Sequence, residues 1–228
     1  MMILRSHFCT ELRSIRRELF QRIWQENQKA GIILLALGDT EDVIVICSWE
    51  HLWPRSYGLT NAPSLTDLHN IRPADANVNS ARGNKYFGEC HVGLNHCKQP
   101  ATKEAARDTE TDIEIWAPPS RVRGDVARSL MYMAVRYGFH RGGEGPSLHL
   151  SDSPSMAKRE MGLLSILMKW NELDPPSREE KLRNERICKL YQHNRNPFID
   201  HPEYAYHIWK RATLGHQSLH HNLKQMDS

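Results

Sequence analysis

The sequence predicts an α+β fold in one domain, and two observations lead to this class. Runs of β-branched and apolar residues, a composition typical of strands, lie before residue 50. Apolar residues recur at helical spacing after residue 120, which indicates several packed helices. The 228 residues suffice for one large domain or two small ones, and no internal repeat divides them. We therefore expect strands first and a mainly helical second half.

The N-terminal part contains the predicted strands. Residues 10–28 carry apolar side chains at roughly helical spacing and predict a helix. The β-branched runs from Ile32 to Leu37 and from Val43 to Cys47 are separated by a short polar segment, and predict a hairpin or two strands. The second run leads directly into Glu50 and His51, so this pair is expected at a strand end.

The middle of the chain alternates between loop and short elements. Residues 53–66 are rich in proline, glycine and asparagine and predict a loop. Leu65 to Ile71 is expected to form a short second strand. Pro73 is expected to start a helix through Ala74 to Ser80, because proline is favoured in a first helical turn. Residues 83–120 are polar and predict irregular structure.

The C-terminal half is predicted to be helical. Apolar residues from Val126 to Tyr137 form one helix face, which Gly138 ends. Ser177 is placed to cap a helix start, with Glu180 at the position that completes a capping box. Further helices are expected from Met161 to Trp170, after Ser177, and from Pro202 to Thr213.

Composition excludes some classes of protein. Hydrophobic residues make up 39% and charged residues 25% of the chain, as in ordinary soluble globular proteins. The net charge of +3 permits nucleic-acid binding without demanding it. No apolar run approaches the ~20 residues of a membrane span, so we expect no membrane partner. The first residues lack the features of a signal peptide.

The cysteines leave several alternatives open. There are five, an odd and sparse set that does not indicate a disulfide scaffold. Cys90-His91 and His96-Cys97 have the look of a zinc clip, but a disulfide or two free thiols is favoured.

Glu50, His51, Asn70 and Asn79 form the pattern that indicates chemistry. An imidazole stands beside a carboxylate, and two amide side chains follow. Hydrolysing a phosphodiester with one metal ion needs a base for water, hard oxygen ligands, and positive charge near the phosphate. A strand with the histidine, a second strand with an asparagine and a helix with a metal ligand describe a ββα-metal, or His-Me finger, arrangement. The alternative is a surface histidine and two turn asparagines.

Several longer segments carry a resemblance to a known family. In order, they are Glu50 to Gly58, Asp67 to Asp75, Asn77 to Asn84, Pro118 to Arg128 and Gln192 to Phe198. With these segments the sequence resembles the endonuclease I family, which consists of nonspecific bacterial endonucleases and plant relatives. The segments are more similar to those of the plant members. The resemblance runs from Trp49 to Trp209. Residues 1–48 do not resemble the family's usual N-terminal helices.

The resemblance implies a ββα-metal core embedded in a mainly helical single domain. It implies a divalent ion, usually Mg²⁺, and cleavage of DNA, often RNA too, with little sequence preference. We expect Ca²⁺ or Mn²⁺ as alternative ions, and we expect a monomer. His51 matches the general base, and Glu50 and Asn79 match the metal ligands. Asn70 matches the catalytic-site asparagine that steadies the loop between the strands.

Three arginines are candidates for phosphate binding. The arginine that follows the base in the family cannot be assigned to any one of them. The candidates are Arg55, Arg72 and Arg82, and for each a solvated or ion-paired surface arginine is the alternative. Trp53 and Tyr57 could stack on bases or pack under the catalytic loop.

These features predict a metal-dependent nonspecific endonuclease that leaves 5′-phosphate ends. Its segments are an atypical N-terminal helix and strands over 1–48, a catalytic domain over 49–212 and a polar tail over 213–228. The main alternative is a catalytically impaired variant that binds nucleic acid, should the atypical N-terminus fail to form the first strand. A third is a structural or zinc-stabilised module around Cys90 and Cys97. The family is usually exported, but no clear signal fixes the location of this chain.

Overall fold

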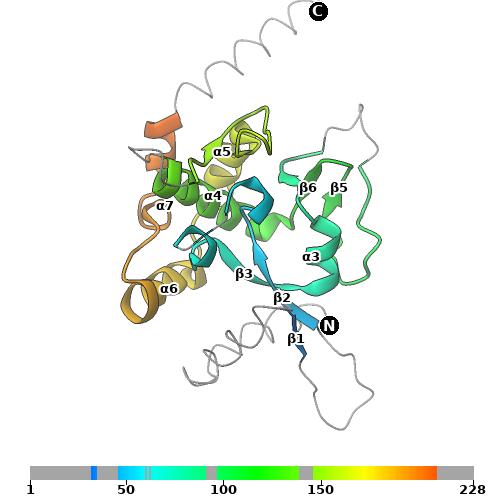
Figure 1. Ribbon diagram of the computed structural model, residues 1–228, viewed down its shortest axis with the longest axis horizontal. Coiled ribbons are helices and arrows are strands. Elements are labelled where there is room, and N and C mark those ends of the chain that lie inside the picture. Colours follow the sequence, from blue (N-terminus) through cyan, green and yellow to red (C-terminus); the bar gives the residue numbers. More distant parts are fainter. Residues whose placement is uncertain are drawn as a thin grey trace, which may run out of the picture.

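The elements that the structure describes form an α+β fold with three small sheets (Figure 1). The computed structural model describes residues 32–34, 46–59, 61, 63–90, 97–138 and 146–209. The helix expected at 10–28 and the strand residues expected at 35–37 and 43–45 lie outside these ranges.

Strand β2 (Ile46–His51) is the centre of the first sheet, whose strand order is β1-β2-β3. It pairs antiparallel with β1 (Ile32–Leu34) and with β3 (Ile71–Asp75), and His51 lies opposite Ile71. The prediction that a strand carries Glu50 and His51 into the site is therefore confirmed. The expected boundary at residue 48 falls inside this strand.

The second strand and the next helix begin later than expected. Residues Ser64–Thr66 form a 3-10 turn, η3, and the strand β3 starts only at Ile71. Pro73 lies in β3 opposite Trp49, and the edge position of β3 explains why a residue without an N–H is tolerated there. The strand expected from Leu65 and the helix start expected at Pro73 are thus wrong.

Helix α3 (Ala76–Arg82) follows β3 without a loop. The side chain of Asp75, the last residue of β3, accepts hydrogen bonds from the backbone N–H groups of Asn77 and Val78. This N-cap satisfies the free donors of the first helical turn. It ends the strand and starts the helix at one residue, which gives a β2–β3–α3 unit.

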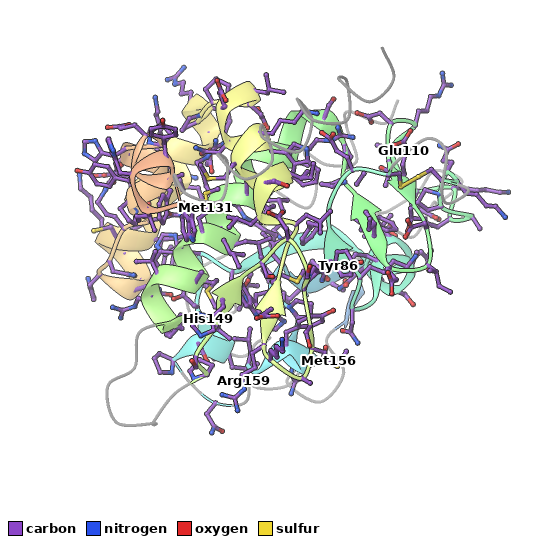
Figure 2. All side chains as sticks on the ribbon, turned by 90° about the horizontal axis from the view of Figure 1, so that it is seen from above. Tyr86, Glu110, Met131, His149, Met156 and Arg159 are labelled. Carbon is purple, nitrogen blue, oxygen red and sulfur yellow. A yellow bond between two sulfur atoms is a disulfide. The ribbon has the colours of Figure 1, made fainter. Side chains whose placement is uncertain are left out.

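Residues 83–120 contain a second sheet where irregular structure was expected. Its strands are β4 (Tyr86–Phe87), β5 (Glu110–Thr111) and β6 (Ile115–Ala117), in the order β4-β6-β5. Strands of two or three residues are too short to show an alternating pattern in the sequence. Cys90 and Cys97 form a disulfide, drawn in yellow in Figure 2, so these sulfurs are not available as zinc ligands.

Helix α4 (Arg123–Gly138), introduced by the 3-10 turn η4 (Ser120–Val122), is the centre of the C-terminal half. Met131, on this helix, is fully buried among the side chains in Figure 2. One core cluster joins α4 to side chains of the N-terminal half such as Trp53 and Phe87, and to Leu167. The two halves therefore share a hydrophobic core.

The other elements are η2 (Arg55–Tyr57), β7 (His149–Leu150), β8 (Glu160–Met161), α5 (Leu164–Leu173), α6 (Arg178–Arg186), the π-helix η5 (Ile187–Gln192), α7 (Pro197–Asp200) and a helical stretch over 204–209. Among them, α5, α7 and β7 pack against α4. Met161, which was expected to start a helix, lies in strand β8 instead. None of the helices in this part of the chain has both the length and the apolar composition that crossing a bilayer requires.

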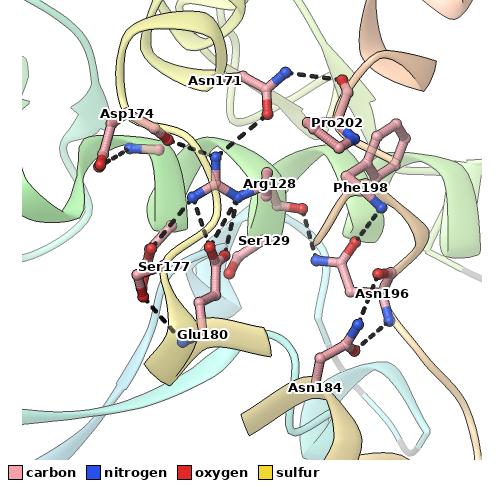
Figure 3. Close-up of polar contacts among 12 residues, drawn as sticks. Arg128, Ser129, Asn171, Asp174, Ser177, Glu180, Asn184, Asn196, Phe198 and Pro202 are labelled. Atoms are coloured by element: carbon pink, nitrogen blue, oxygen red, sulfur yellow. Dashed lines mark hydrogen bonds and ion pairs between the residues drawn. The ribbon is translucent and has the colours of Figure 1, made fainter. Parts of the chain in front are cut away.

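The expected capping box at α6 forms only in part. The Ser177 hydroxyl accepts a hydrogen bond from the Glu180 N–H at 3.0 Å, as a helix cap does. The Glu180 carboxylate does not close the box, because it is buried and binds Arg128 of α4 (Figure 3). This ion pair fixes α6 against α4.

Candidate active site

His51 stands at the end of β2 with its ring held by a backbone carbonyl. Its Nε2 lies 2.9 Å from the carbonyl oxygen of Leu65. A carbonyl oxygen can only accept, so Nε2 carries the proton and Nδ1 is the unprotonated nitrogen of the neutral ring. Because the Leu65 carbonyl occupies Nε2, Nδ1 is the ring nitrogen left to accept a proton.

The electrostatic surroundings of His51 favour the neutral ring. Burial lowers its pKa, and the positive charges of Arg55 and Arg82 act in the same direction. The hydrogen bond to Leu65 opposes them but does not reverse the shift. A histidine with a lowered pKa is uncharged at neutral pH and can accept a proton.

Glu50 and Asn79 both lie at the interface where β2 packs on α3. Ser48 and Glu50, two residues apart on a strand, share one face, and Asn79 and Arg82, three apart on a helix, share another. Asn79 Nδ2 donates to Ser48 Oγ at 2.8 Å, and Arg82 donates to Glu50 Oε1 at 2.6 Å. Two contacts between the same two faces thus bring the carboxylate and the amide together at one interface.

The donor set suits a hard cation. Within the described residues Arg82 is the sole hydrogen-bond partner of the Glu50 carboxylate, and it contacts Oε1. Asn79 uses its amide nitrogen on Ser48, so its Oδ1 and Glu50 Oε2 remain as oxygen donors. Oxygen atoms from carboxylates and amides are ligands that Mg²⁺, Ca²⁺ and Mn²⁺ accept. These two residues could therefore hold a divalent ion.

The Glu50 carboxyl group has a raised pKa. Burial raises it to about 7, against the opposing effect of the Arg82 guanidinium. A carboxyl group that is half protonated near neutral pH gains from a bound cation, since the cation compensates its charge.

Asn70 fastens the turn that follows His51. Its side chain is fully buried, accepts from the Trp53 N–H at 2.7 Å and donates to the Trp53 carbonyl at 3.2 Å. Its backbone carbonyl accepts from the Leu52 N–H at 3.0 Å. Asn70, the residue before β3, therefore holds the part of the chain that directly follows His51.

The three candidate arginines occupy different environments. Arg82 is buried, donates to the carbonyl oxygens of His51 and Leu52 in addition to Glu50, and lies over the Phe87 ring. This geometry suits a residue that holds Glu50 and the end of β2 more than one that contacts a phosphate.

Arg72 and Arg55 differ in whether the guanidinium group has a protein partner. Arg72 donates to Ser129 Oγ at 3.2 Å and lies 3.8 Å from Asp125. Arg55 is exposed on η2, and its guanidinium has no hydrogen-bond or ion-pair partner in the part of the chain that the structure describes. Arg55 is thus the candidate with a cationic group free to meet a phosphate near His51.

Trp53 and Tyr57 pack beneath the turn that follows His51. Both are buried, and the Trp53 indole N–H donates to the Tyr57 carbonyl at 3.2 Å. Of the two alternatives left by the sequence, packing is the one that the structure supports.

Sequence reasoning missed two contributors. Ser48 orients Asn79, and it could have been found, because alternate strand positions share a face with Glu50. The Leu65 carbonyl orients His51, but a backbone atom in a turn leaves no signal in the residue types.

Comparison with known proteins identifies the family. The profile of the Endonuclease I family matches residues 10–203, and the chain belongs to this family. It is 49% identical over 164 residues to an "Extracellular ribonuclease" of Bacillus amyloliquefaciens, covering 70% of this chain and 53% of that protein. It is 45% identical over 165 residues to an "Extracellular ribonuclease" of Bacillus subtilis, with the same two coverages.

A more distant relative carries a different name. The chain is 31% identical over 134 residues to an "Extracellular deoxyribonuclease" of Aeromonas hydrophila, covering 59% of this chain and 49% of that protein. The chain thus spans about half the length of the curated relatives it matches. The family match begins at residue 10 and so includes most of the segment before Trp49. The division of the chain at residue 48 stays a prediction. The closer likeness to plant members stays a prediction, since these three relatives are bacterial.

Proposed function

We propose that this chain is a metal-dependent endonuclease that hydrolyses phosphodiester bonds of DNA and RNA without sequence preference and leaves 5′-phosphate ends. One observation carries the proposal. The β2–β3–α3 unit carries His51, whose Nε2 is bound to the Leu65 carbonyl, at the end of β2, and it carries Glu50 and Asn79 at the interface of β2 and α3. This is the arrangement expected of a ββα-metal core, and the catalytic domain extends over residues 49–212.

His51 is the general base in this proposal. Nδ1 accepts a proton from a water molecule, which attacks the phosphorus, while the Leu65 carbonyl keeps the ring in position through Nε2. Glu50 and Asn79 would hold Mg²⁺, with Ca²⁺ or Mn²⁺ as alternatives, and the bound ion would supply positive charge for the phosphate and the leaving 3′ oxygen. Asn70 keeps the turn after His51 in place.

Substrate choice follows from the kind of contact. Binding through phosphates gives affinity without sequence information, so a site served by a free cation such as Arg55 accepts many sequences. Relatives named ribonuclease and deoxyribonuclease are both similar to this chain, which supports testing RNA and DNA side by side. The ribonuclease-named relatives are the more similar, so we expect RNA to be cut at least as well as DNA.

The reason for considering a catalytically impaired binding protein no longer holds. It assumed that no strand leads into Glu50, whereas β2 runs through residues 46–51 and is paired on both sides. An anchored strand end is what a catalytic histidine needs to keep its geometry.

Cleavage assays on supercoiled plasmid and on a long single-stranded RNA test the proposal. We expect both to be cut with Mg²⁺ and neither with excess EDTA. Products should be ligated without prior phosphorylation, because they carry 5′-phosphates. Binding without cleavage at any divalent ion, or cleavage that EDTA leaves unchanged, would contradict the proposal.

A further inference from the structure

A buried carboxylate lies outside the residues assigned so far. Asp67 is 1% exposed, and its Oδ2 accepts hydrogen bonds from the hydroxyls of Tyr132 at 2.8 Å and Tyr137 at 2.7 Å. Its Oδ1 accepts from the His69 N–H at 2.9 Å. A buried carboxylate is costly unless hydrogen bonds satisfy it, and the two tyrosines serve as its donors.

Both tyrosines come from helix α4 and remain protonated. Burial and the negative charge of Asp67 raise the pKa of each phenol above its ordinary value. The hydroxyl of Tyr132 in turn accepts from the side-chain amide of Asn194 at 2.6 Å. Helix α4 thus presents two fixed donors to a single residue of the turn before β3.

The same turn is also held from the C-terminal side. Arg183 of α6 donates to the carbonyl oxygens of Leu68 and Ile71, at 2.5 and 2.9 Å. The Leu68 N–H donates to Gln192 Oε1 at 2.8 Å. Residues 67–71 are therefore fixed by three elements that are far from them in the sequence.

The turn contacts the catalytic strand at both of its ends. Leu65, two residues before Asp67, supplies the carbonyl oxygen that binds His51 Nε2. Asn70, three residues after Asp67, binds both backbone polar groups of Trp53. The Asp67 carbonyl closes the turn between them by accepting from the Asn70 N–H at 3.0 Å. A shift of Asp67 would move both contacts at once.

We propose that Asp67, Tyr132 and Tyr137 are positioning residues for the general base. Through their hydrogen bonds helix α4 fixes the position of the turn that contains Asp67. The turn then fixes the position of the Leu65 carbonyl oxygen that binds His51. The ring is thereby kept as the tautomer with Nε2 protonated and Nδ1 free. The kinetic part of this inference rests on the proposed function, whereas the tautomer is a property of the folded protein alone.

Two variants and one control test the proposal. Asp67→Asn replaces the carboxylate by an amide, and Tyr132→Phe/Tyr137→Phe removes both donors with little change in shape. Glu180→Gln is the matched control, because it also neutralises a buried, hydrogen-bonded carboxylate but lies in the α4–α6 contact. Circular dichroism gives the folded fraction of each variant, and rates are expressed per folded molecule. Tyr137→Phe alone serves as the milder change should the others fail to fold.

Two readouts separate positioning from a general loss of stability. We expect Asp67→Asn and the double tyrosine variant to lower kcat by about 10- to 100-fold, with KM changed less than about threefold, since misplacing a catalytic group by about 1 Å costs rate rather than binding. Long-range ¹H–¹⁵N spectra report the tautomer of His51, whose signal is assigned by its loss in His51→Gln. The parent should show Nε2–H, and both variants should gain the Nδ1–H form.

Each outcome decides the question. If Glu180→Gln keeps the parent's kcat and tautomer while the other variants lose both, the inference is supported. If the tautomer and kcat of the Asp67 and tyrosine variants match those of the parent, or change no more than those of the control, the inference is overturned. A parent without nuclease activity would defeat the proposed function, and the tautomer comparison would still decide this one.

Discussion

Two buried arginine–glutamate pairs, one in each half of the molecule, have the same separation and different surroundings. Arg82 and Glu50 lie 2.6 Å apart, as do Arg128 and Glu180. Arg128 binds both oxygens of Glu180 and also the Asp174 carbonyl (Figure 3). Arg82 binds only one oxygen of Glu50, and its Nε has no partner among the described residues.

The difference separates a structural pair from one that is open to a ligand. Both side chains of the Arg128–Glu180 pair have 0% exposure, and each charged group has its hydrogen bonds within the protein. The Glu50 side chain keeps 12% exposure, and one of its oxygens is left without a protein partner in the described part of the chain. A buried charge that is only half satisfied is unfavourable by itself, so a bound cation is the natural complement.

The largest effect on the cleavage rate should come from the region of the Arg82–Glu50 pair. His51→Ala removes the proposed base, and a positioned general base contributes roughly 10²–10⁴-fold to the rate. We expect plasmid nicking to fall by that factor, with the melting temperature and DNA affinity nearly unchanged. Nicking within about threefold of the parent's rate would show that His51 is not the base.

The structural pair should respond in the opposite way. Glu180→Ala leaves Arg128 buried without its anion, a change that costs about 3–5 kcal/mol of the free energy of unfolding. Urea denaturation measures this loss, and kcat per folded molecule should stay at the parent's value. Glu50→Ala is the matched variant, and it also leaves a buried arginine, Arg82, without its anion, so it should lose stability as well. The two pairs are distinguished by kcat per folded molecule, and an unchanged kcat in Glu50→Ala would erase the distinction.

The proposed metal ligands should change the metal requirement. Glu50→Ala and Asn79→Ala are each expected to raise the Mg²⁺ concentration that gives half the maximal rate. Glu50 should have the larger effect, because it carries the charge. Titrations of rate against Mg²⁺ measure this, with Asn77→Ala, on the same helix, as the control. An unchanged half-maximal concentration in both variants would remove Glu50 and Asn79 from the coordination shell.

Much of the frame of the site could be predicted from the sequence. The strand leading into Glu50 follows from a β-branched run, and helix α4 follows from its apolar face. The start of β3 could not be predicted, because the local hydrogen bonds of Asp67 form a turn where the apolar residues suggested a strand. Local turn chemistry competes with strand pairing, and only the folded structure shows which of them prevails.

The nitrogen that we propose as the base could also not be predicted from the sequence. The tautomer of His51 depends on a carbonyl oxygen 14 residues away, and the position of that oxygen depends on Asp67 and on two tyrosines of a distant helix. Residue types identify Glu50, His51 and Asn79 as a chemical set. They do not say which atoms the surrounding protein has already used.

The smallest predicted effect is a pH dependence that separates the two acid–base groups of the site. Burial raises the pKa of Glu50 to about 7 in the ion-free protein, whereas burial lowers the pKa of His51 below its ordinary 6.5. As pH falls below 7, protons should therefore compete with Mg²⁺ for Glu50 while His51 is still neutral. The Mg²⁺ concentration for half the maximal rate should rise by at most about tenfold per pH unit.

Rates measured with excess Mg²⁺ test this prediction. Between pH 6 and pH 7 added Mg²⁺ should restore the rate, because the lost step is metal binding at Glu50 and His51 remains a base. In Glu50→Gln, which has no proton to compete, the half-maximal Mg²⁺ concentration should be high and independent of pH over this range. A rate that falls below pH 7 and does not recover with Mg²⁺ would mean that His51 itself is protonated there, and that the Leu65 carbonyl stabilises the imidazolium more than burial opposes it.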